Sequence, residues 1–229
     1  MVLLTRGKDR ELLGRLAALG VEAAEVALLE QVDLPGLGEL PRRLLEPWDY
    51  VAVTSKEGAK RLLWAWERAG KPPLKVAAVG EGTAEVLRAG GLAPAFVPPR
   101  ATAQDLARGF PRAERVLFVA GDLAGRDLEE GLRARGVRVE RQEVYATRER
   151  ALSPEERGLL ERAQVVAFFS PSGVRAFARH TERRPRAAAI GPSTAQEARR
   201  LGFPVVEAEN PGLEGLWQAL RKALGYNAS

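Results

Sequence analysis

One short stretch occurs twice in the sequence, and this internal duplication constrains the fold more than any other feature. Residues 76–84 read Val-Ala-Ala-Val-Gly-Glu-Gly-Thr-Ala, and residues 187–195 read Ala-Ala-Ala-Ile-Gly-Pro-Ser-Thr-Ala. Each copy is an apolar run typical of a buried strand, then a glycine where we expect a tight turn, then the start of a helical pattern. In an open α/β sheet such a corner lies at the carboxyl end of a strand, where backbone N–H groups face a ligand.

The duplication extends beyond these two corners. Ser55 and Gly58 match Ser170 and Gly173 at an offset of 115 positions, and Val2-Leu-Leu matches Val116-Leu-Phe at 114, close to the offset of 111 between Gly80 and Gly191 of the two corners, and all three occur in the same order. Such similar offsets indicate the duplication of one unit. Two copies are too few for a solenoid, so we expect two similar lobes with a crevice between them.

Apolar runs of strand type alternate with helical patterns along the whole chain. We expect strands at residues 2–5, 21–29, 50–54, 75–79, 95–97, 115–119, 137–145, 165–169, 187–190 and 205–207. This alternation predicts an α/β fold with parallel sheets and right-handed crossovers. Glu30 to Gly38, rich in Pro and Gly, and the polar segment Ala146 to Ala151 are the two predicted linkers. Residues 225–229 carry no pattern, and we expect no regular structure there.

The composition excludes several classes of site. Cysteine is absent, which rules out disulfides and thiolate chemistry, and the apolar and charged contents of 45% and 28% are those of a soluble globular protein. There is no apolar run long enough to span a membrane, and the N-terminus lacks a charged leader. We therefore expect a cytoplasmic protein with no membrane partner.

Basic residues exceed acidic ones by five, and most of them are arginines. Arginine suits carboxylate or phosphate partners, so a nucleic-acid surface is one interpretation. An ion-paired surface of the kind found in thermophiles is the other. We favour the second and expect no nucleic-acid partner, because no segment clusters basic residues with aromatic ones.

The usual catalytic sets are mostly missing. The single histidine, His180, lies in a charged helix end, where we expect a solvated side chain rather than a catalytic base or a metal ligand. No Walker A sequence occurs, and Glu85 stands where a dinucleotide fingerprint needs its third glycine.

Hydroxyl side chains at the strand-turn-helix corners are the remaining candidates: Ser55, Thr83, Ser170, Ser172, Ser193 and Thr194. Taken singly, each could simply cap the helix that it precedes. Their recurrence in both halves favours a cradle for carboxylates or phosphates, to which Arg6 at the end of the first strand would add a cation. Tyr145 ends a strand at the second linker, and a packing role and a proton-donating role are both open for it.

Motifs in order along nearly the whole chain resemble those of uroporphyrinogen III synthases: Thr5-Arg6, Val53-Thr-Ser55, Ala78-Val-Gly-Glu-Gly-Thr-Ala84, Glu143-Val-Tyr145, Phe169-Ser-Pro-Ser-Gly173 and Ile190-Gly-Pro-Ser-Thr-Ala195. The resemblance implies flavodoxin-like lobes, residues 1–34 with 149–229 forming one and residues 35–148 forming the other. It also implies cyclisation of the linear tetrapyrrole hydroxymethylbilane to uroporphyrinogen III with inversion of ring D, through an azafulvene and a spiro intermediate.

The resemblance implies no cofactor and no metal, and we expect a monomer. A transient contact with the enzyme that supplies hydroxymethylbilane stays open. Tyr145 matches the family's tyrosine thought to assist departure of the hydroxyl group. The residues that match the family's substrate-binding crevice are Thr83, Ser170, Ser172, Gly173, Ser193, Thr194, Gly80, Gly82, Gly191, Ser55 and Arg6.

Two other functions use the same corners. A cofactor-free binding or sensor protein for an anionic small molecule would clasp its ligand without chemistry, and Tyr145 would then be dispensable. A nucleotide-dependent transferase would use Gly80 and Gly191, and a nucleotide would protect it against heat.

Overall fold

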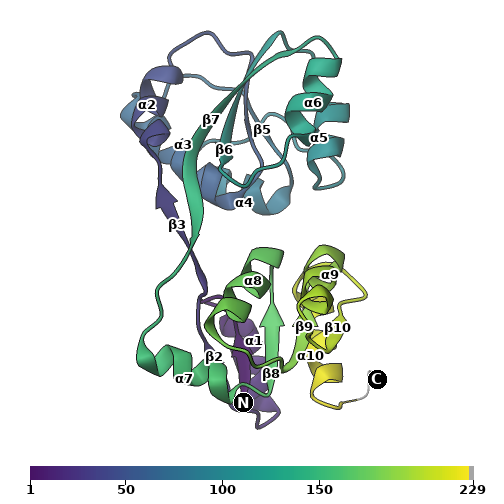
Figure 1. The fold of residues 1–229 in the computed structure, drawn as a ribbon. Coiled ribbons are helices and arrows are strands. Elements are labelled where there is room, and N and C mark those ends of the chain that lie inside the picture. The colour runs from purple at the N-terminus through teal and green to yellow at the C-terminus, as the bar shows by residue number, and fades with distance from the viewer. Residues whose placement is uncertain (227–229) are drawn as a thin grey trace. The chain divides into compact units, whose positions relative to one another are not determined.

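The computed structural model describes residues 1–226, which form two compact α/β units (Figure 1). The terminal lobe contains Met1–Glu30 and the chain from Arg148 onward, and the inserted lobe is Gln31–Thr147. Residues 227–229, part of the tail for which the sequence predicts no regular structure, lie outside the described residues.

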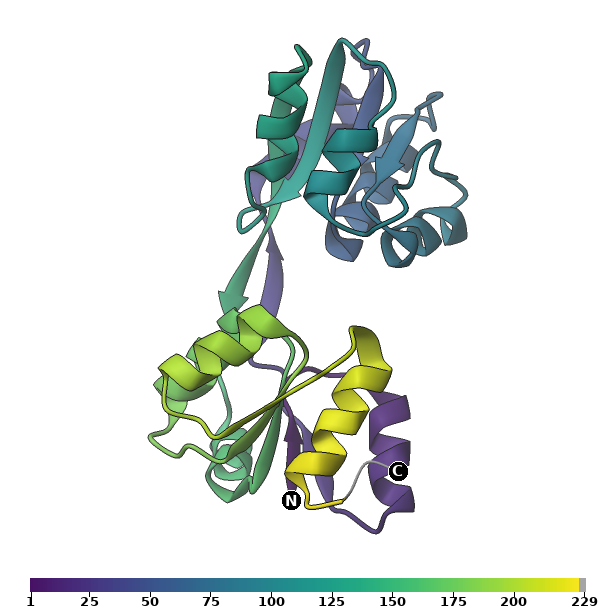
Figure 2. The same ribbon diagram turned by 90° about the vertical axis from the view of Figure 1, so that its right-hand side faces the viewer.

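The terminal lobe is built on the sheet β10-β9-β8-β1-β2, in which every neighbouring pair is parallel. Its strands are β1 Val2–Leu4, β2 Ala23–Glu25, β8 Val165–Phe168, β9 Arg186–Ala189 and β10 Val205–Glu207. In the lobe's own chain order this is 2-1-3-4-5, the flavodoxin-like order. One face is covered by α1 (Arg10–Ala18) and α10 (Gly212–Ala223), which lie side by side in Figure 2. The other face is covered by α7 (Pro154–Arg162), α8 (Pro171–His180) and α9 (Pro192–Arg200).

The inserted lobe is built on the sheet β3-β7-β6-β4-β5. Its strands are β3 Leu29–Asp33, β4 Tyr50–Val53, β5 Val76–Ala78, β6 Arg115–Gly121 and β7 Arg138–Glu149. One face carries α2 (Pro35–Arg43), α3 (Lys56–Arg68) and α4 (Glu81–Ala89), and the other carries α5 (Ala103–Gly109) and α6 (Asp127–Ala134). The strand predicted at 95–97 is reduced to one parallel bridge between Phe96 and Ala77.

The repeated sequence motifs fall on equivalent strands of the two sheets. In the order β9-β8-β1-β2 of the terminal lobe, the strands correspond to β5-β4-β6-β7 of the inserted lobe. The predicted two-lobed α/β fold with parallel sheets is therefore confirmed. Because helices cover both faces of each sheet, the strands are apolar at successive positions. In β1, for example, Val2 and Leu4 point into one core and Leu3 into the other.

The two predicted linkers carry regular structure, which the sequence pattern did not indicate. Glu30 to Gly38 forms most of β3 and the start of α2, with Pro35 at the first helical position, where its missing N–H costs nothing. The second segment continues β7 as far as Glu149. As connections between the lobes both segments are where the sequence predicts them, since the division falls at Glu30/Gln31 and Thr147/Arg148. Only their regular structure was missed, in the first segment because of its Pro and Gly and in the second because strand residues that face water are polar. The chain passes between the lobes within β3 and β7.

Among residues 1–226, every helix is too short or too polar to cross a membrane.

Gly36 and Gly38 provide a matched test of how α2 packs against β7. A Cβ atom on Gly36 would lie 2.2 Å from the backbone oxygen of Glu143, whereas one on Gly38 would meet nothing within 4 Å. Gly36→Ala is expected to lower the free energy of unfolding by about 1–3 kcal/mol, as overpacking does. Gly38→Ala is expected to raise it by up to about 1 kcal/mol, because alanine is the better helix former.

Tryptophan fluorescence during urea unfolding measures this difference. Three of the four tryptophans, Trp48, Trp64 and Trp66, lie in the inserted lobe, so the signal reports mainly on that lobe. Equal shifts of the midpoint in the two variants would show that the approach of α2 to β7 is not a constraint.

Candidate functional site

Two serines cap equivalent helices at the carboxyl ends of equivalent strands. Ser55 follows β4 with an extended backbone, and its Oγ accepts a hydrogen bond of 2.9 Å from the N–H of Gly58. Ser170 follows β8 in the same conformation and accepts one of 3.0 Å from Gly173. Each serine satisfies one N–H that the first helical turn cannot pair. The sequence match of Ser55 with Ser170 thus reflects the same local structure.

Gly80 and Gly191 also occupy equivalent positions, as the N-caps of α4 and α9, and the chain bends at both, as predicted. The bend itself does not require glycine. Both glycines have extended backbones, with φ of −168° and −167°, a conformation open to any residue. Gly80 is constrained by contact instead, since a Cβ atom there would lie 2.5 Å from the Cβ of Ala101. At Gly191 a Cβ atom would meet nothing within 4 Å.

The first turns of α4 and α9 contain the other predicted hydroxyls. Thr83 and Thr194 take the third position of each helix and are buried, with 5% and 2% of their surface exposed. Ser193 is exposed at the second position of α9. Gly82 takes that position in α4, where the side chain of Lys56 lies against it, its Cε 3.0 Å from where a Cβ atom would be. A lysine beside a helix N-terminus supplies a positive charge in addition to the free N–H groups, and both attract an anion.

Tyr145 and Ser55 meet at the carboxyl end of the inserted lobe's sheet, although 90 positions separate them in the sequence. Their hydroxyl oxygens are 2.8 Å apart, and either can be the donor. Because Ser55 already accepts the N–H of Gly58, its own proton is free to go to Tyr145. In that arrangement the phenol proton of Tyr145 is available to another group.

The ring of Tyr145 is enclosed and 9% exposed. The guanidinium carbon of Arg61 lies 4.8 Å from its centroid, and Arg61 is itself held by Asp33 at 2.9 Å and Glu57 at 2.8 Å. Burial would raise the pKa of Glu57, but hydrogen bonds from Arg61 and Lys60 outweigh burial and lower it. Glu57 therefore stays ionised and keeps Arg61 in place over the ring.

At the carboxyl edge of the terminal lobe, Arg6 follows β1 and stacks on Phe169, with its guanidinium carbon 3.8 Å from the ring centroid. It also forms an ion pair of 2.7 Å with Asp9. Phe169 directly precedes Ser170, so Arg6 and this capped corner share the edge expected from the sequence.

On α8, the hydroxyl of Ser172 accepts a hydrogen bond of 3.2 Å from Arg175. Arg175 lies 3.7 Å from Glu197 of α9, and a hydrogen bond from Arg200 lowers the pKa of Glu197. Arg175 and Glu197 thereby link α8 to α9 beside the predicted hydroxyls.

Sequence reasoning found Arg6 but missed Arg61, Arg175 and the close contacts around these hydroxyls. Arg175 follows Ser172 by three positions, a helical neighbour spacing that could have indicated it, and Arg61 follows Glu57 by four. Contacts across the sheet, such as that of Gly121 with the Tyr145 ring, leave no local signal.

His180 departs from the prediction of a solvated helix end. The residue is half-buried at the end of α8, and its Nε2 is buried with no hydrogen-bond partner among residues 1–226. The reason is packing: the last turn of α8 carries the buried Phe177 and leads to the buried Thr181. Within the same residues, no group of three acidic or histidine side chains is placed to hold a metal ion.

Solved structures from two bacteria share this fold. The structure of uroporphyrinogen-III synthetase from Helicobacter pylori 26695 aligns with a TM-score of 0.73 at 20% identity, covering 98% of each chain. A mutant uroporphyrinogen III synthase from the extremely thermophilic bacterium Thermus thermophilus aligns with a TM-score of 0.66 at 20% identity, also over 98% of each chain. At these identities the similarity establishes the fold.

Sequence comparisons establish the family. The chloroplastic uroporphyrinogen-III synthase of Oryza sativa subsp. japonica is 33% identical over 96% of this chain and 78% of its own length. The uroporphyrinogen-III synthase of Synechococcus elongatus is 27% identical over 75% of this chain and 70% of its own. The family model described as uroporphyrinogen-III synthase HemD matches residues 10–218. The chain therefore belongs to the uroporphyrinogen-III synthase family.

Proposed function

We propose that this protein is a uroporphyrinogen III synthase that cyclises hydroxymethylbilane, inverting ring D and releasing water. The family match over residues 10–218 supports the overall reaction. The observation that carries the chemistry is the hydrogen bond of 2.8 Å between the hydroxyls of Tyr145 and Ser55. It gives a neutral, oriented proton donor at the end of a strand.

The proposed substrate carries eight carboxylates, and the proposed contacts suit them. Helix N-termini present free N–H groups and hydroxyls, which bind anions without a formal charge of their own. Arg6 and Lys56 add cations at these corners. We assign substrate binding to the residues at the two sheet edges: Arg6, Ser55, Gly80, Gly82, Thr83, Ser170, Ser172, Gly173, Gly191, Ser193 and Thr194.

The first chemical step is loss of the terminal hydroxyl group. The pyrrole nitrogen's electron pair moves into the ring, the C–O bond breaks, and the azafulvene forms as its N-protonated cation, whose charge is balanced by the phenolate left on Tyr145. The proton that ring D loses at the final closure restores the phenol. Tyr145 donates its proton to the departing oxygen, which leaves as water, while Ser55 donates a hydrogen bond that stabilises the developing negative charge on the phenol oxygen.

The later steps need positioning more than acid–base groups. The substituted carbon of ring D attacks the azafulvene to give a spiro intermediate, which fragments and recloses with ring D inverted. If the protein holds the carboxylates fixed, the substituted carbon of ring D is already oriented toward the azafulvene. This favours attack by that carbon over attack by the unsubstituted one, because the entropy of orientation is lost on binding and not in the reaction step.

The proposed setting is the cytoplasm and the proposed state a monomer, with no nucleic-acid partner. The rice relative is named as chloroplastic, so members of the family occupy different compartments. Size-exclusion chromatography with light scattering tests the oligomeric state.

The isomer of the product tests the function. Hydroxymethylbilane closes without a catalyst to the type I isomer, without inversion. Fresh hydroxymethylbilane with the purified protein is expected to give mainly type III after oxidation and chromatography. If folded protein yields only the type I isomer, the proposed activity is wrong, and the alternative is a protein that binds an anionic small molecule without catalysis.

Tyr145→Phe is expected to lower kcat by about 100-fold, the low end for loss of a general acid, because the substrate's own nitrogen assists ionisation. Steady-state rates of type III formation measure it. The control is Tyr50→Phe, in the same lobe at the start of β4, where the ring packs edge-on against Phe110 at 5.3 Å. If both phenylalanine variants behave alike, Tyr145 has no chemical role.

Ser55→Ala is expected to lower kcat by about tenfold, which equals about 1.4 kcal/mol, the scale of one hydrogen bond to a charged group. It also removes a helix cap, so the control is Ser153→Ala, which removes the capping box of α7 in the terminal lobe. Both variants are expected to lose about 1 kcal/mol of stability with their helix cap, and only Ser55→Ala is expected to lose activity. That result would separate the capping role of Ser55 from its role in catalysis. An unchanged kcat in Ser55→Ala would rule out its assistance to Tyr145.

A further inference from the structure

The backbone between β6 and α6 is held by one arginine of β7. Arg141 donates through Nη2 to the carbonyl oxygens of Gly121 at 3.3 Å and Ala124 at 2.7 Å. Through Nη1 it donates to the carbonyl oxygen of Gly125 at 3.2 Å. Three carbonyls within five residues thus converge on one planar cation, which fixes the conformation of residues 121–125, hereafter the β6–α6 loop.

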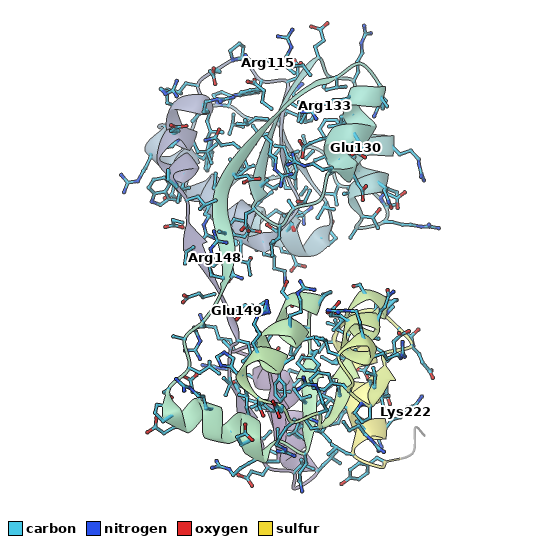
Figure 3. The ribbon with its side chains drawn as sticks, in the orientation of Figure 1. Arg115, Glu130, Arg133, Arg148, Glu149 and Lys222 are labelled. Atoms are coloured by element: carbon cyan, nitrogen blue, oxygen red, sulfur yellow. The ribbon has the colours of Figure 1, made fainter. Side chains whose placement is uncertain are left out.

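Arg141 is itself fixed by two carboxylates. Glu129, only 1% exposed, accepts from it at 2.6 Å, and Glu143 accepts at 2.8 Å. Burial lowers the pKa of Arg141, but hydrogen bonds to Glu143 and Glu129 outweigh burial and raise it. Glu129 also pairs with Arg126 at 3.2 Å and with Arg133 at 3.7 Å, the latter labelled on α6 in Figure 3. The buried charges are therefore compensated, as a stable buried pair requires.

The same loop forms the wall against which Tyr145 rests. Gly121 lies opposite Tyr145 in the sheet, after a shift of register between Ala120 and Gly121. A Cβ atom on Gly121 would lie 2.5 Å from Cζ of Tyr145 and 2.7 Å from its hydroxyl oxygen. The ring therefore touches the loop's backbone directly, and only glycine leaves room for it.

Two further hydrogen bonds tie the loop to the strand that carries the tyrosine. The N–H of Asp122 donates to the carbonyl oxygen of Tyr145 at 3.0 Å, and the Asp122 carboxylate accepts from the N–H of Thr147 at 3.1 Å. The position of the ring thus depends on the loop, and the conformation of the loop depends on Arg141.

We propose that Arg141 and Gly121 are positioning residues for Tyr145, which keep its hydroxyl on Ser55 and aimed at the substrate. This inference rests on the proposed function of Tyr145. Arg141 acts by holding the loop and Gly121 by leaving space, and neither takes part in the chemistry.

The terminal lobe carries a simpler version of the same device. β1 and β2 correspond to β6 and β7. Glu25 of β2 is paired in register with Leu4 of β1, and in the inserted lobe Arg141 of β7 is paired in the same way with Phe118 of β6. The carboxylate of Glu25 accepts a hydrogen bond of 2.8 Å from the N–H of Asp9, in the loop that follows β1. In both lobes a side chain of the neighbouring strand therefore holds this loop, with one hydrogen bond in the terminal lobe and three in the inserted lobe.

The first test compares Arg141→Gln with Arg135→Gln. Arg135 also holds two backbone carbonyls of the inserted lobe, those of Ala107 at 2.7 Å and Phe110 at 2.9 Å, but none in the β6–α6 loop. Arg141→Gln is expected to lower kcat by about tenfold or more, as misplacement of a reacting group does, with KM changed by less than about threefold. Arg135→Gln should leave kcat as in the wild type. Arg141→Lys should recover little, because lysine lacks the planar fork.

A second variant covers the case in which Arg141→Gln fails to fold with Glu129 left unpaired. Gly121→Ala is expected to lower kcat about tenfold in the wild type but less than about twofold in Tyr145→Phe, because coupled residues are not additive. An equal loss in both backgrounds would overturn the inference, as would wild-type kcat in both Arg141→Gln and Gly121→Ala. Wild-type protein that forms no type III isomer would instead overturn the proposed function itself.

Discussion

Parallel strand pairing is the constraint on which both lobes depend. A parallel neighbour cannot be reached by a tight turn, so consecutive strands that belong to one parallel sheet are joined by a crossover, here a helix packed on the sheet. The carboxyl ends of all parallel strands then share one edge, and the N-termini of the helices collect there. Ser55, Ser170, Gly80 and Gly191 all stand at such N-termini. The proposed anion binding at these edges therefore has its basis in the topology, before any particular side chain is considered.

Much of this arrangement could be predicted from the sequence because its determinants are local. An apolar run followed by a serine and a glycine three positions later specifies a buried strand and a capped helix wherever it occurs, and both copies fold accordingly. The capping box at Ser153 and Glu156 depends on equally local residues. The duplicated pattern also indicated the equivalent sheets, since equal offsets along the chain require equal spacing of elements.

The remainder depends on contacts that leave no local signal. The hydroxyls of Ser55 and Tyr145 are neighbours only because β4 and β7 both flank β6 in the sheet. The need for glycine at position 80 arises from Ala101, and not from backbone conformation as the sequence suggested. The helix α2 escaped prediction because Pro35 and two glycines resemble a loop, although Leu37 and Leu40 are buried. In each case the decisive partner lies on another element.

The terminal lobe draws one of its inner strands, β1, from the beginning of the chain. β1 pairs with β8, so that Leu3 lies beside Val166, and the hydroxyl of Thr5 donates to the carbonyl of Ala167 at 2.6 Å. The inserted lobe, in contrast, is continuous from Gln31 to Thr147. During synthesis the ribosome therefore releases a complete inserted lobe first, while β1 waits unpaired on its β8 side. The lobes are therefore completed in the reverse of the order in which they begin, and pairing β1 with β8 closes the larger loop, which costs more loop entropy.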